Sequence, residues 1–144
     1  MRSLWVSVSL AVSISFVQSL AATVPQAAVS LYAWEDVEGV ASWYSRDDPG
    51  VTPWTANAER FDDQALTCAI WGAPFDARLR VTNLANGRSI IVRVNDRGPA
   101  ERLILAESRI IDLTKTAFAT IANPVVGLIR VRVELISGAA SPSL

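Results

Sequence analysis

The stretch from Leu79 to Pro99 reads L-R-V-T-N-L-A-N-G-R-S-I-I-V-R-V-N-D-R-G-P and carries the clearest structural pattern in the chain. Apolar and polar residues alternate on both sides of Asn86-Gly87, a pair that favours the tight turn of a β-hairpin. Pro99 ends the second run, because proline lacks the amide hydrogen that a strand ladder uses. The stretch therefore predicts two antiparallel strands, the second of which ends in the polar sequence Asn95-Asp96-Arg97.

Further strands are predicted on both sides of this hairpin. From Ile129 to Leu135 every second residue is apolar, which is typical of a half-buried strand. Gly39 to Ser45 is another candidate strand. Many short strands predict a mostly β domain that closes into a small barrel, because closure removes exposed strand edges.

Helix is scarce in the sequence. Leu113 to Asn123 is the best candidate, because Pro124 follows its end and Asp112 or Thr114 can cap its start. Asp112 is therefore interpreted as a helix cap rather than as a catalytic group.

The amino terminus has the layout of a secretory signal peptide over residues 1–22. Arg2 precedes an uncharged, largely apolar run from Leu4 to Ala22, and small residues at its end suit a cleavage site. The run approaches the length of a membrane anchor, but its serines and Gln18 disfavour that alternative. We expect this segment to be removed and the protein to be exported to the periplasm or to the extracellular side of the cell envelope.

The remaining chain of about 122 residues suits one compact core. We expect residues 23–38 to be a leader, residues 39–136 to form the domain, and residues 137–144 to be a disordered tail. Cys68 is the only cysteine and is expected to be a buried, inert thiol. It is also too far from the apolar leader to serve as a lipid-anchoring cysteine. The mature protein is thus expected to be a monomer without a stable membrane anchor.

Composition excludes several kinds of chemistry. Without Arg2 the chain carries 12 basic and 14 acidic residues, a net charge of −2, which gives no electrostatic reason to bind nucleic acid. The sequence contains no histidine, which excludes Ser-His or Cys-His catalysis and histidine-ligated zinc. We expect no metal or other cofactor, so any chemistry has to use carboxyl groups.

Five ordered motifs resemble the RlpA (rare lipoprotein A) family across residues 39–136. The resemblance implies a six-stranded double-psi β-barrel with one or two short helices, and peptidoglycan glycan strands as the ligand. Family members with activity are lytic transglycosylases that cleave strands lacking stem peptides during cell-wall remodelling. The motifs are Gly39-Val40-Ala41-Ser42-Trp43-Tyr44, Thr55-Ala56-Asn57-Ala58-Glu59-Arg60-Phe61-Asp62, Val81-Thr82-Asn83-Leu84-Ala85-Asn86-Gly87-Arg88, Val92-Arg93-Val94-Asn95-Asp96-Arg97-Gly98-Pro99 and Arg109-Ile110-Ile111-Asp112-Leu113-Thr114.

Asp96 is the principal candidate for catalysis. It continues the alternation of Ile90, Val92 and Val94, so an extended strand would place its carboxyl group at the rim of the barrel. The resemblance implies that Asp96 acts as general acid and then as base, with Glu59 as the orienting or charge-stabilising partner.

Four further residues are predicted to bind the glycan. Asp62 would accept a hydrogen bond from a sugar hydroxyl, and Trp54, in a Pro-Trp-Thr loop, would offer an aromatic face for stacking. Asn95 and Arg97 flank the catalytic candidate in sequence and are assigned to substrate binding for that reason.

The sequence also departs from the family. Ile70 stands where active relatives commonly carry a histidine, and the segment from Ala100 to Ser108 is several residues longer than usual. These departures favour an alternative function, a non-catalytic, expansin-like module that binds glycan without cutting it. A second alternative is that Asp96 only binds backbone amides at the end of its strand.

Overall fold

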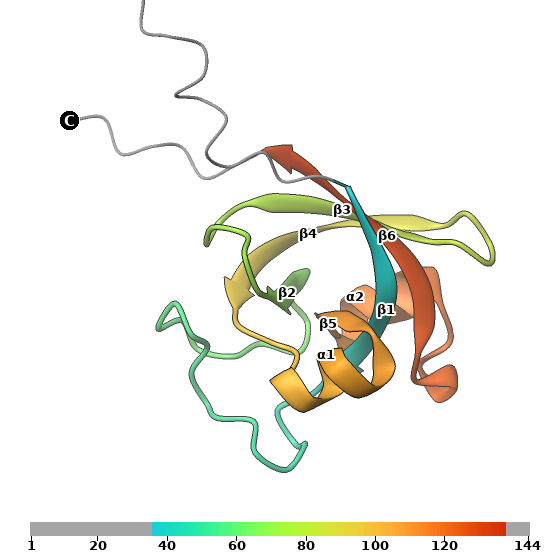
Figure 1. Ribbon diagram of the computed structural model, residues 1–144. Coiled ribbons are helices and arrows are strands. Elements are labelled where there is room, and N and C mark those ends of the chain that lie inside the picture. The colour runs from blue at the N-terminus through green and yellow to red at the C-terminus, as the bar shows by residue number, and fades with distance from the viewer. Residues whose placement is uncertain (1–35, 138–144) are drawn as a thin grey trace, which may run out of the picture. The chain divides into compact units, whose positions relative to one another are not determined.

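The computed structural model describes residues 36–137, and within them six strands close into one barrel (Figure 1). The order around the barrel is β1-β5-β2-β4-β3-β6. A mostly β, closed six-stranded barrel is therefore confirmed. The strands are β1 (Val37–Tyr44), β2 (Thr67–Ile70), β3 (Arg78–Asn83), β4 (Ser89–Asp96), β5 (Arg109–Thr114) and β6 (Ile129–Ser137).

The predictions for residues 1–22, for the leader as far as residue 35 and for residues 138–144 lie outside the described residues. Within residues 36–137, the helices are all too short to cross a membrane.

Two parallel strand pairs bring distant segments together. β1 lies parallel to β5, and β2 lies parallel to β4, while the other neighbouring pairs are antiparallel. In this register Ala69 of β2 is opposite Asp96 on one side and opposite Asp112 on the other. Neighbouring strands lie about 4.8 Å apart, so the two aspartates sit at one level of the barrel with about 10 Å between their strands.

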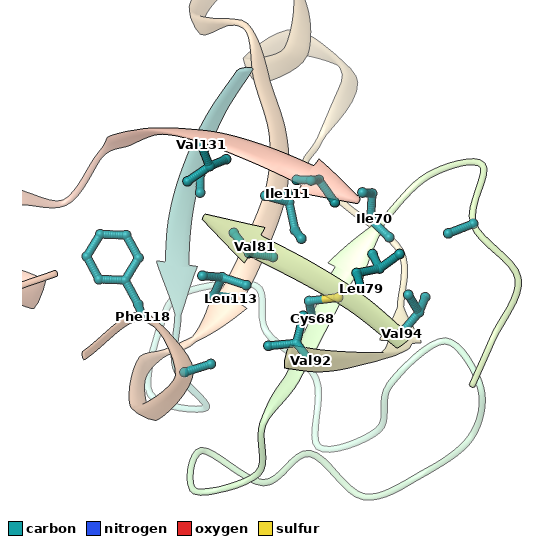
Figure 2. Close-up of a cluster of buried hydrophobic side chains, with 14 of the residues drawn as sticks. Cys68, Ile70, Leu79, Val81, Val92, Val94, Ile111, Leu113, Phe118 and Val131 are labelled. Carbon is teal, nitrogen blue, oxygen red and sulfur yellow. The ribbon is translucent and has the colours of Figure 1, made fainter. Parts of the chain in front are cut away.

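The interior of the barrel is filled by the alternating apolar residues of the strands (Figure 2). Leu79, Val81, Val92 and Val94 are at most 1% exposed, whereas Ile91, of opposite parity, is 43% exposed. Burial of each such side chain contributes about 1.5–3 kcal/mol to folding. The alternation predicted for the hairpin is therefore confirmed in detail.

Cys68 lies in this core and is fully buried, as predicted. Burial raises the pKa of the Cys68 thiol, because the thiolate is poorly solvated there. The group is consequently held in its inert, protonated form.

The predicted helix begins later than expected. Helix α2 spans Lys115–Ile121, and Leu113 and Thr114 belong instead to β5, where both are fully buried. Thr114 occupies the cap position, but its hydroxyl donates to Ala65 O (2.6 Å) and not to the helix. The interpretation of Asp112 as a helix cap is wrong. This residue lies within β5, between Ile111 and Leu113, whose side chains are buried in the barrel.

Residues 100–108, predicted from the sequence to be longer than the matching segment of the family, contain a second helix, α1 (Glu101–Glu107). It buries none of its side chains fully and packs beside β5, at the end of the barrel where β4 terminates (Figure 1). A short 3-10 helix, η2 (Pro124–Val126), leads into β6. The expectation of one or two short helices is confirmed by α1 and α2.

Candidate functional site

A cleft of about 520 Å³ opens at the end of the barrel where β1, β4 and β5 meet α1 and the loop of residues 45–54. We call it the rim cleft. Both polar and apolar atoms line it, which suits a ligand such as a sugar that presents hydroxyl groups and apolar faces. It is lined by Trp43, Tyr44, Asp48, Pro49, Gly50, Val51, Thr52, Trp54, Ala69, Asp96, Arg97, Gly98, Ala100, Arg102, Leu103, Arg109 and Asp112.

Asp96 is the last residue of β4 and lines the rim cleft. Its Oδ1 accepts hydrogen bonds from two backbone amides, those of Ala56 (2.9 Å) and Arg97 (2.8 Å). Its Oδ2 accepts one hydrogen bond from the Tyr44 hydroxyl, at 3.3 Å. The amides therefore fix the carboxyl group, while Oδ2 stays the less engaged of its two oxygens.

Tyr44 supplies that hydroxyl from the end of β1. Burial raises the pKa of Tyr44, and the nearby charge of Asp96 raises it further. The phenol ring also packs edge-on against Phe61, with 4.8 Å between the ring centroids. Tyr44 thus stays a neutral donor in a fixed position.

Asp112 is the second carboxyl group of the rim cleft. The Ser42 hydroxyl donates a hydrogen bond to its Oδ1, and Arg109 Nη2 lies 3.5 Å from the same oxygen. An ideal Cβ at Gly98 would lie 3.3 Å from Asp112 Oδ2, so glycine at that position leaves room for the carboxyl group. The turn that follows Asp96 therefore closely approaches Asp112.

The pKa of Asp112 is raised, chiefly by burial and additionally by the negative charge of Asp96, although Ser42 and Arg109 lower it. The negative charge of Asp96 therefore acts on Asp112 across the cleft, and Ser42 and Arg109 offset part of that effect.

Glu59 does not line the rim cleft. Its two oxygens each accept a 2.8 Å hydrogen bond from Arg93, and its Oε2 also accepts one from Asn95. Arg93 additionally contacts Asp76 at 2.7 Å. We call Glu59, Arg93 and Asp76 the Arg93 cluster.

The hydrogen bonds from Arg93 are the main reason why the pKa of Glu59 falls from its ordinary value of 4.5 to about 2. At neutral pH this carboxyl group is ionised and has no proton to donate. This carboxyl group ties the loop of residues 55–59 to β4, because it accepts hydrogen bonds from the side chains of Arg93 and Asn95. The loop held in this way presents Ala56 N to Asp96.

The other predicted site residues divide between the rim cleft and its surroundings. Trp54 lines the cleft and is 60% exposed, so its ring is accessible to a ligand. Arg97 also lines the cleft, but its guanidinium group stacks over Phe75 and donates to Ile70 O (3.1 Å). Asn95 is 4% exposed and binds Glu59 instead of facing the cleft. Asp62 accepts a bond from Gln64 N and lies outside the cleft lining.

Ile70, predicted to stand where active relatives carry a histidine, is 2% exposed and packs in the barrel core. It is absent from the lining of the rim cleft. The Ile70 side chain therefore packs in the barrel core and does not line the cleft that contains Asp96.

Sequence reasoning missed Asp112, Tyr44 and Arg102 as cleft residues. Asp112 had a usable signal: it alternates with Ile111 and Leu113, which are both fully buried, so its side chain points to the other face of β5. No sequence pattern indicated Arg102, because its place in the lining of the cleft depends on how α1 packs. Among the described residues, no group of three or more acidic or cysteine side chains is arranged to hold a metal ion.

Comparisons with known proteins agree with this architecture. The sequence model described as "Lytic transglycolase" matches residues 36–133. The probable endolytic peptidoglycan transglycosylase RlpA of Nostoc sp. is 42% identical over 99 residues, which are 69% of this chain and 25% of that protein. The endolytic peptidoglycan transglycosylase RlpA of Campylobacter jejuni is 41% identical over 109 residues, which are 76% of this chain and 37% of that protein. The chain thus spans well under half the length of these relatives.

Solved structures show the same fold at low sequence identity. A Streptomyces papain inhibitor superposes with a TM-score of 0.55 and 21% identity, over 72% of this chain and 96% of that protein. A Clavibacter michiganensis expansin mutant in complex with cellohexaose superposes with a TM-score of 0.54 and 19% identity, over 76% of this chain and 54% of the expansin. At these identities the superpositions establish the fold alone.

Proposed function

Because the chain belongs to the lytic transglycolase family of double-psi β-barrels, we propose that it cleaves peptidoglycan glycan strands as an endolytic lytic transglycosylase. The observation that carries this proposal is the pairing of Asp96 and Asp112 across Ala69 in one open cleft. Cleavage of a glycosidic bond commonly uses two carboxyl groups, of which one moves a proton and the other stabilises positive charge.

Asp96 is the proton-transferring group. Protonated at Oδ2, it donates to the glycosidic oxygen that joins C1 of N-acetylmuramic acid to the next sugar, and the bond from C1 to that oxygen breaks. The ionised Asp96 then accepts the proton of the muramic acid C6 hydroxyl, whose oxygen bonds to C1. The product is a 1,6-anhydromuramic end, no water is consumed, and Asp96 regains its proton.

Tyr44 and the two backbone amides support this cycle. The amide hydrogen bonds hold Oδ1 still, so that Oδ2 can point toward the substrate. The Tyr44 hydroxyl, kept neutral by burial, stabilises Oδ2 after it has given up its proton.

Asp112 takes the charge-stabilising role that the sequence suggested for Glu59. Its carboxylate, fixed by Ser42 and Arg109, would face the positive charge that develops at C1 as the bond breaks. Glu59 would act indirectly, because its carboxylate ties the loop that presents Ala56 N to Arg93 and Asn95 of β4.

The wall of the rim cleft supplies the sugar-binding surface. Trp54 exposes an aromatic ring, and such rings stack on the apolar faces of sugars. The expansin in complex with cellohexaose lends support, since about half of that glycan-bound protein superposes on this barrel. Peptidoglycan lies outside the cytoplasm, so the proposal also requires export, in agreement with the signal peptide expected at residues 1–22.

A second candidate function is glycan binding without cleavage. It is favoured by the two backbone amides on Asp96 Oδ1, an arrangement that also suits a purely structural strand end. On this alternative the rim cleft would bind a strand and release it unchanged.

Product analysis separates the two functions. The chain without residues 1–22 is incubated with peptide-free glycan strands, and the products are examined by mass spectrometry for 1,6-anhydromuramic ends. Such ends are expected with the natural sequence and not with Asp96→Asn. Strand binding without any such product would overturn the enzymatic proposal in favour of the binding module.

A further inference from the structure

Arg109 and Asp112 both line the rim cleft, although a regular strand would separate them. Side chains alternate between the two faces of a strand, so residues three positions apart normally point in opposite directions. Here one residue of β5 is skipped in the pairing with β1. Val40 is opposite Arg109, whereas the next residue of β1 is opposite Ile111. A β-bulge of this kind re-aims side chains, and it lets the guanidinium group of Arg109 come within 3.5 Å of Asp112.

The skipped residue, Ile110, has room for its side chain because residue 39 is glycine. A Cβ atom at Gly39 would lie 2.7 Å from Ile110 Cγ2, well inside the separation of about 3.5–4.0 Å at which carbon atoms pack. The glycine that opens the first motif shared with the RlpA family therefore permits the bulge that turns Arg109 toward Asp112.

The guanidinium group of Arg109 reaches Asp112 by two routes. Its Nη2 lies 3.5 Å from Asp112 Oδ1, and the same nitrogen donates a hydrogen bond to Ser42 Oγ. Ser42 in turn donates its hydroxyl hydrogen to Asp112 Oδ1. Because Arg109 occupies a lone pair of the Ser42 oxygen, the hydroxyl hydrogen is directed at the carboxylate.

The position of this guanidinium group is not the one that stability alone favours. Within residues 36–137, Arg109 Nε is buried and has no hydrogen-bond partner. A buried donor without a partner costs free energy, and such costs are characteristic of functional sites. The remaining nitrogen, Nη1, lies 3.4 Å from Glu107 Oε2 at the end of α1.

Asp112 needs help to stay ionised. Burial raises its pKa most and the charge of Asp96 raises it further, whereas Ser42 and Arg109 lower it. Tyr44 and Cys68, which are also close, are kept neutral by burial. Lys115 of α2 is placed over the Trp43 ring. The other charged groups in the lining of the cleft are Asp48, Arg97 and Arg102.

We propose that Arg109 is a positioning residue of the cleavage site, which acts directly and through Ser42 to keep the carboxylate of Asp112 fixed and negatively charged. The inference rests on the proposed function, because the charge of Asp112 matters for cleavage only if positive charge develops on the sugar. Glu107 ties the same arginine to α1, so the segment of residues 100–108 bears on Asp112 through one side chain.

The test measures kcat for the release of 1,6-anhydromuramic ends as a function of pH. Arg109→Met removes the charge and the donors while it keeps most of the side-chain volume. Ser42→Ala removes only the hydroxyl group between the arginine and the carboxylate, and it is the second variant if Arg109→Met does not fold. Arg132→Met is the matched control, because Arg132 is also a strand arginine in an ion pair, 2.7 Å from Glu38, and does not line the cleft.

Arg109 lowers the pKa of Asp112, so its removal should raise that pKa and move the acidic side of the pH profile to higher pH. We expect kcat of Arg109→Met to fall about tenfold on the acidic side and about threefold or less at higher pH. Ser42→Ala should change the profile in the same direction by less, and Arg109→Lys should restore part of the acidic side because it keeps the charge. Arg132→Met should keep the natural profile.

The carboxyl carbon of Asp112 is followed by NMR titration in the same proteins, which needs no substrate. Its midpoint should move to higher pH in Arg109→Met and stay unchanged in Arg132→Met. An Arg109→Met or Ser42→Ala protein that folds, cleaves and keeps both the natural profile and the natural midpoint would overturn the inference alone. A loss of kcat that is uniform at every pH would also overturn it, because Arg109 would then be merely structural. Absence of cleavage by the natural sequence at every pH would overturn the proposed function and this inference with it.

Discussion

The rim cleft and the Arg93 cluster both contain carboxyl groups from the motifs shared with the RlpA family. The two sites shift the pKa of these groups in opposite directions. In the cleft, Asp112 is largely buried and its pKa is raised. In the cluster, Glu59 is 40% exposed and Arg93 lowers its pKa to about 2. A carboxyl group that lines an open cleft can act on a bound ligand, whereas one that accepts two hydrogen bonds from a guanidinium group away from the cleft suits a structural role.

The two regions are nevertheless connected through one loop. The Glu59 side chain ties the loop of residues 55–59 to Arg93 and Asn95 of β4, and Ala56 of that loop donates to Asp96. The motif around Glu59 can therefore be required for the rim cleft even though it supplies no reacting group to that cleft. The variants below test this division of labour.

The largest effect is expected for Asp96→Asn. The amide keeps an acceptor for Ala56 N and Arg97 N but cannot cycle a proton, so the rate of strand cleavage should fall by about 10³-fold. Cleavage is measured by the release of 1,6-anhydromuramic ends, and the melting temperature is recorded in parallel. Asp47→Asn is the matched control, because Asp47 is exposed in the neighbouring loop outside the cleft lining. Equal activity of the two variants would remove Asp96 from the mechanism.

A smaller loss is expected for Asp112→Asn. Asparagine can still accept a hydrogen bond from Ser42, but the negative charge facing the reacting carbon is gone, so kcat should fall by about 10- to 100-fold. Some loss of stability is also expected, because Arg109 loses one of its two acidic partners and keeps only Glu107. Rates are therefore compared well below both melting temperatures. Undiminished kcat would mean that the cleft works with Asp96 alone.

Trp54→Ala should weaken strand binding by about three- to tenfold through loss of a stacking surface. Since Trp54 is 60% exposed, its removal leaves no cavity in the core. Binding is measured with peptide-free strands, and Trp54→Phe is the control that keeps an aromatic face. If Trp54→Phe is as weak as Trp54→Ala, a stacking role for the ring is excluded.

The smallest effect is expected for Glu59→Gln, and it should appear in stability. The pKa of Glu59 in the folded protein, about 2, is below its ordinary 4.5, so the ion pair stabilises the fold above about pH 4.5 and is lost as the pH falls through 2. Solvent screens this half-exposed pair, so we expect about 1 kcal/mol at pH 7 and a smaller difference near pH 2.

Denaturant unfolding at the two pH values measures that difference, and Glu134→Gln, on β6 and outside the ion pairs, is the control. Cleavage by Glu59→Gln should stay within about threefold of the natural rate, because Arg93 and Asn95 can still hold a neutral glutamine. A loss as large as that of Asp96→Asn would show that Glu59 belongs to the reacting groups and would break the contrast between the two regions.

Much of the fold could be predicted from local pattern. The alternation in residues 79–94, with Asn86-Gly87 at the turn, gave both hairpin strands, because a half-buried strand needs one apolar face. The helix start was predicted wrongly because Asp112 and Thr114 suit a cap as well as a strand. Only the pairing of β5 with β1 and β2, which buries Leu113 and Thr114, decides between them.

The site depends more heavily on distant contacts. That Asp96 ends a strand followed from Gly98-Pro99, a signal within three residues of it. The pairing of Asp96 with Asp112 did not follow, because it arises where β2 inserts between β4 and β5 and places Ala69 opposite both. The role of Arg93 also required the structure, since its partner Glu59 is 34 residues away in the chain.

By itself, the sequence determined the strand pattern, the inward apolar rows, the reliance on carboxyl chemistry and the resemblance to one family, because these depend on residue type and short-range spacing. Which carboxyl groups come together, and which one is held by an arginine, depends on the tertiary structure. The physical reason is that charge and burial act over a few ångströms in space, and a closed barrel with two parallel strand pairs sets those distances between residues far apart in the chain.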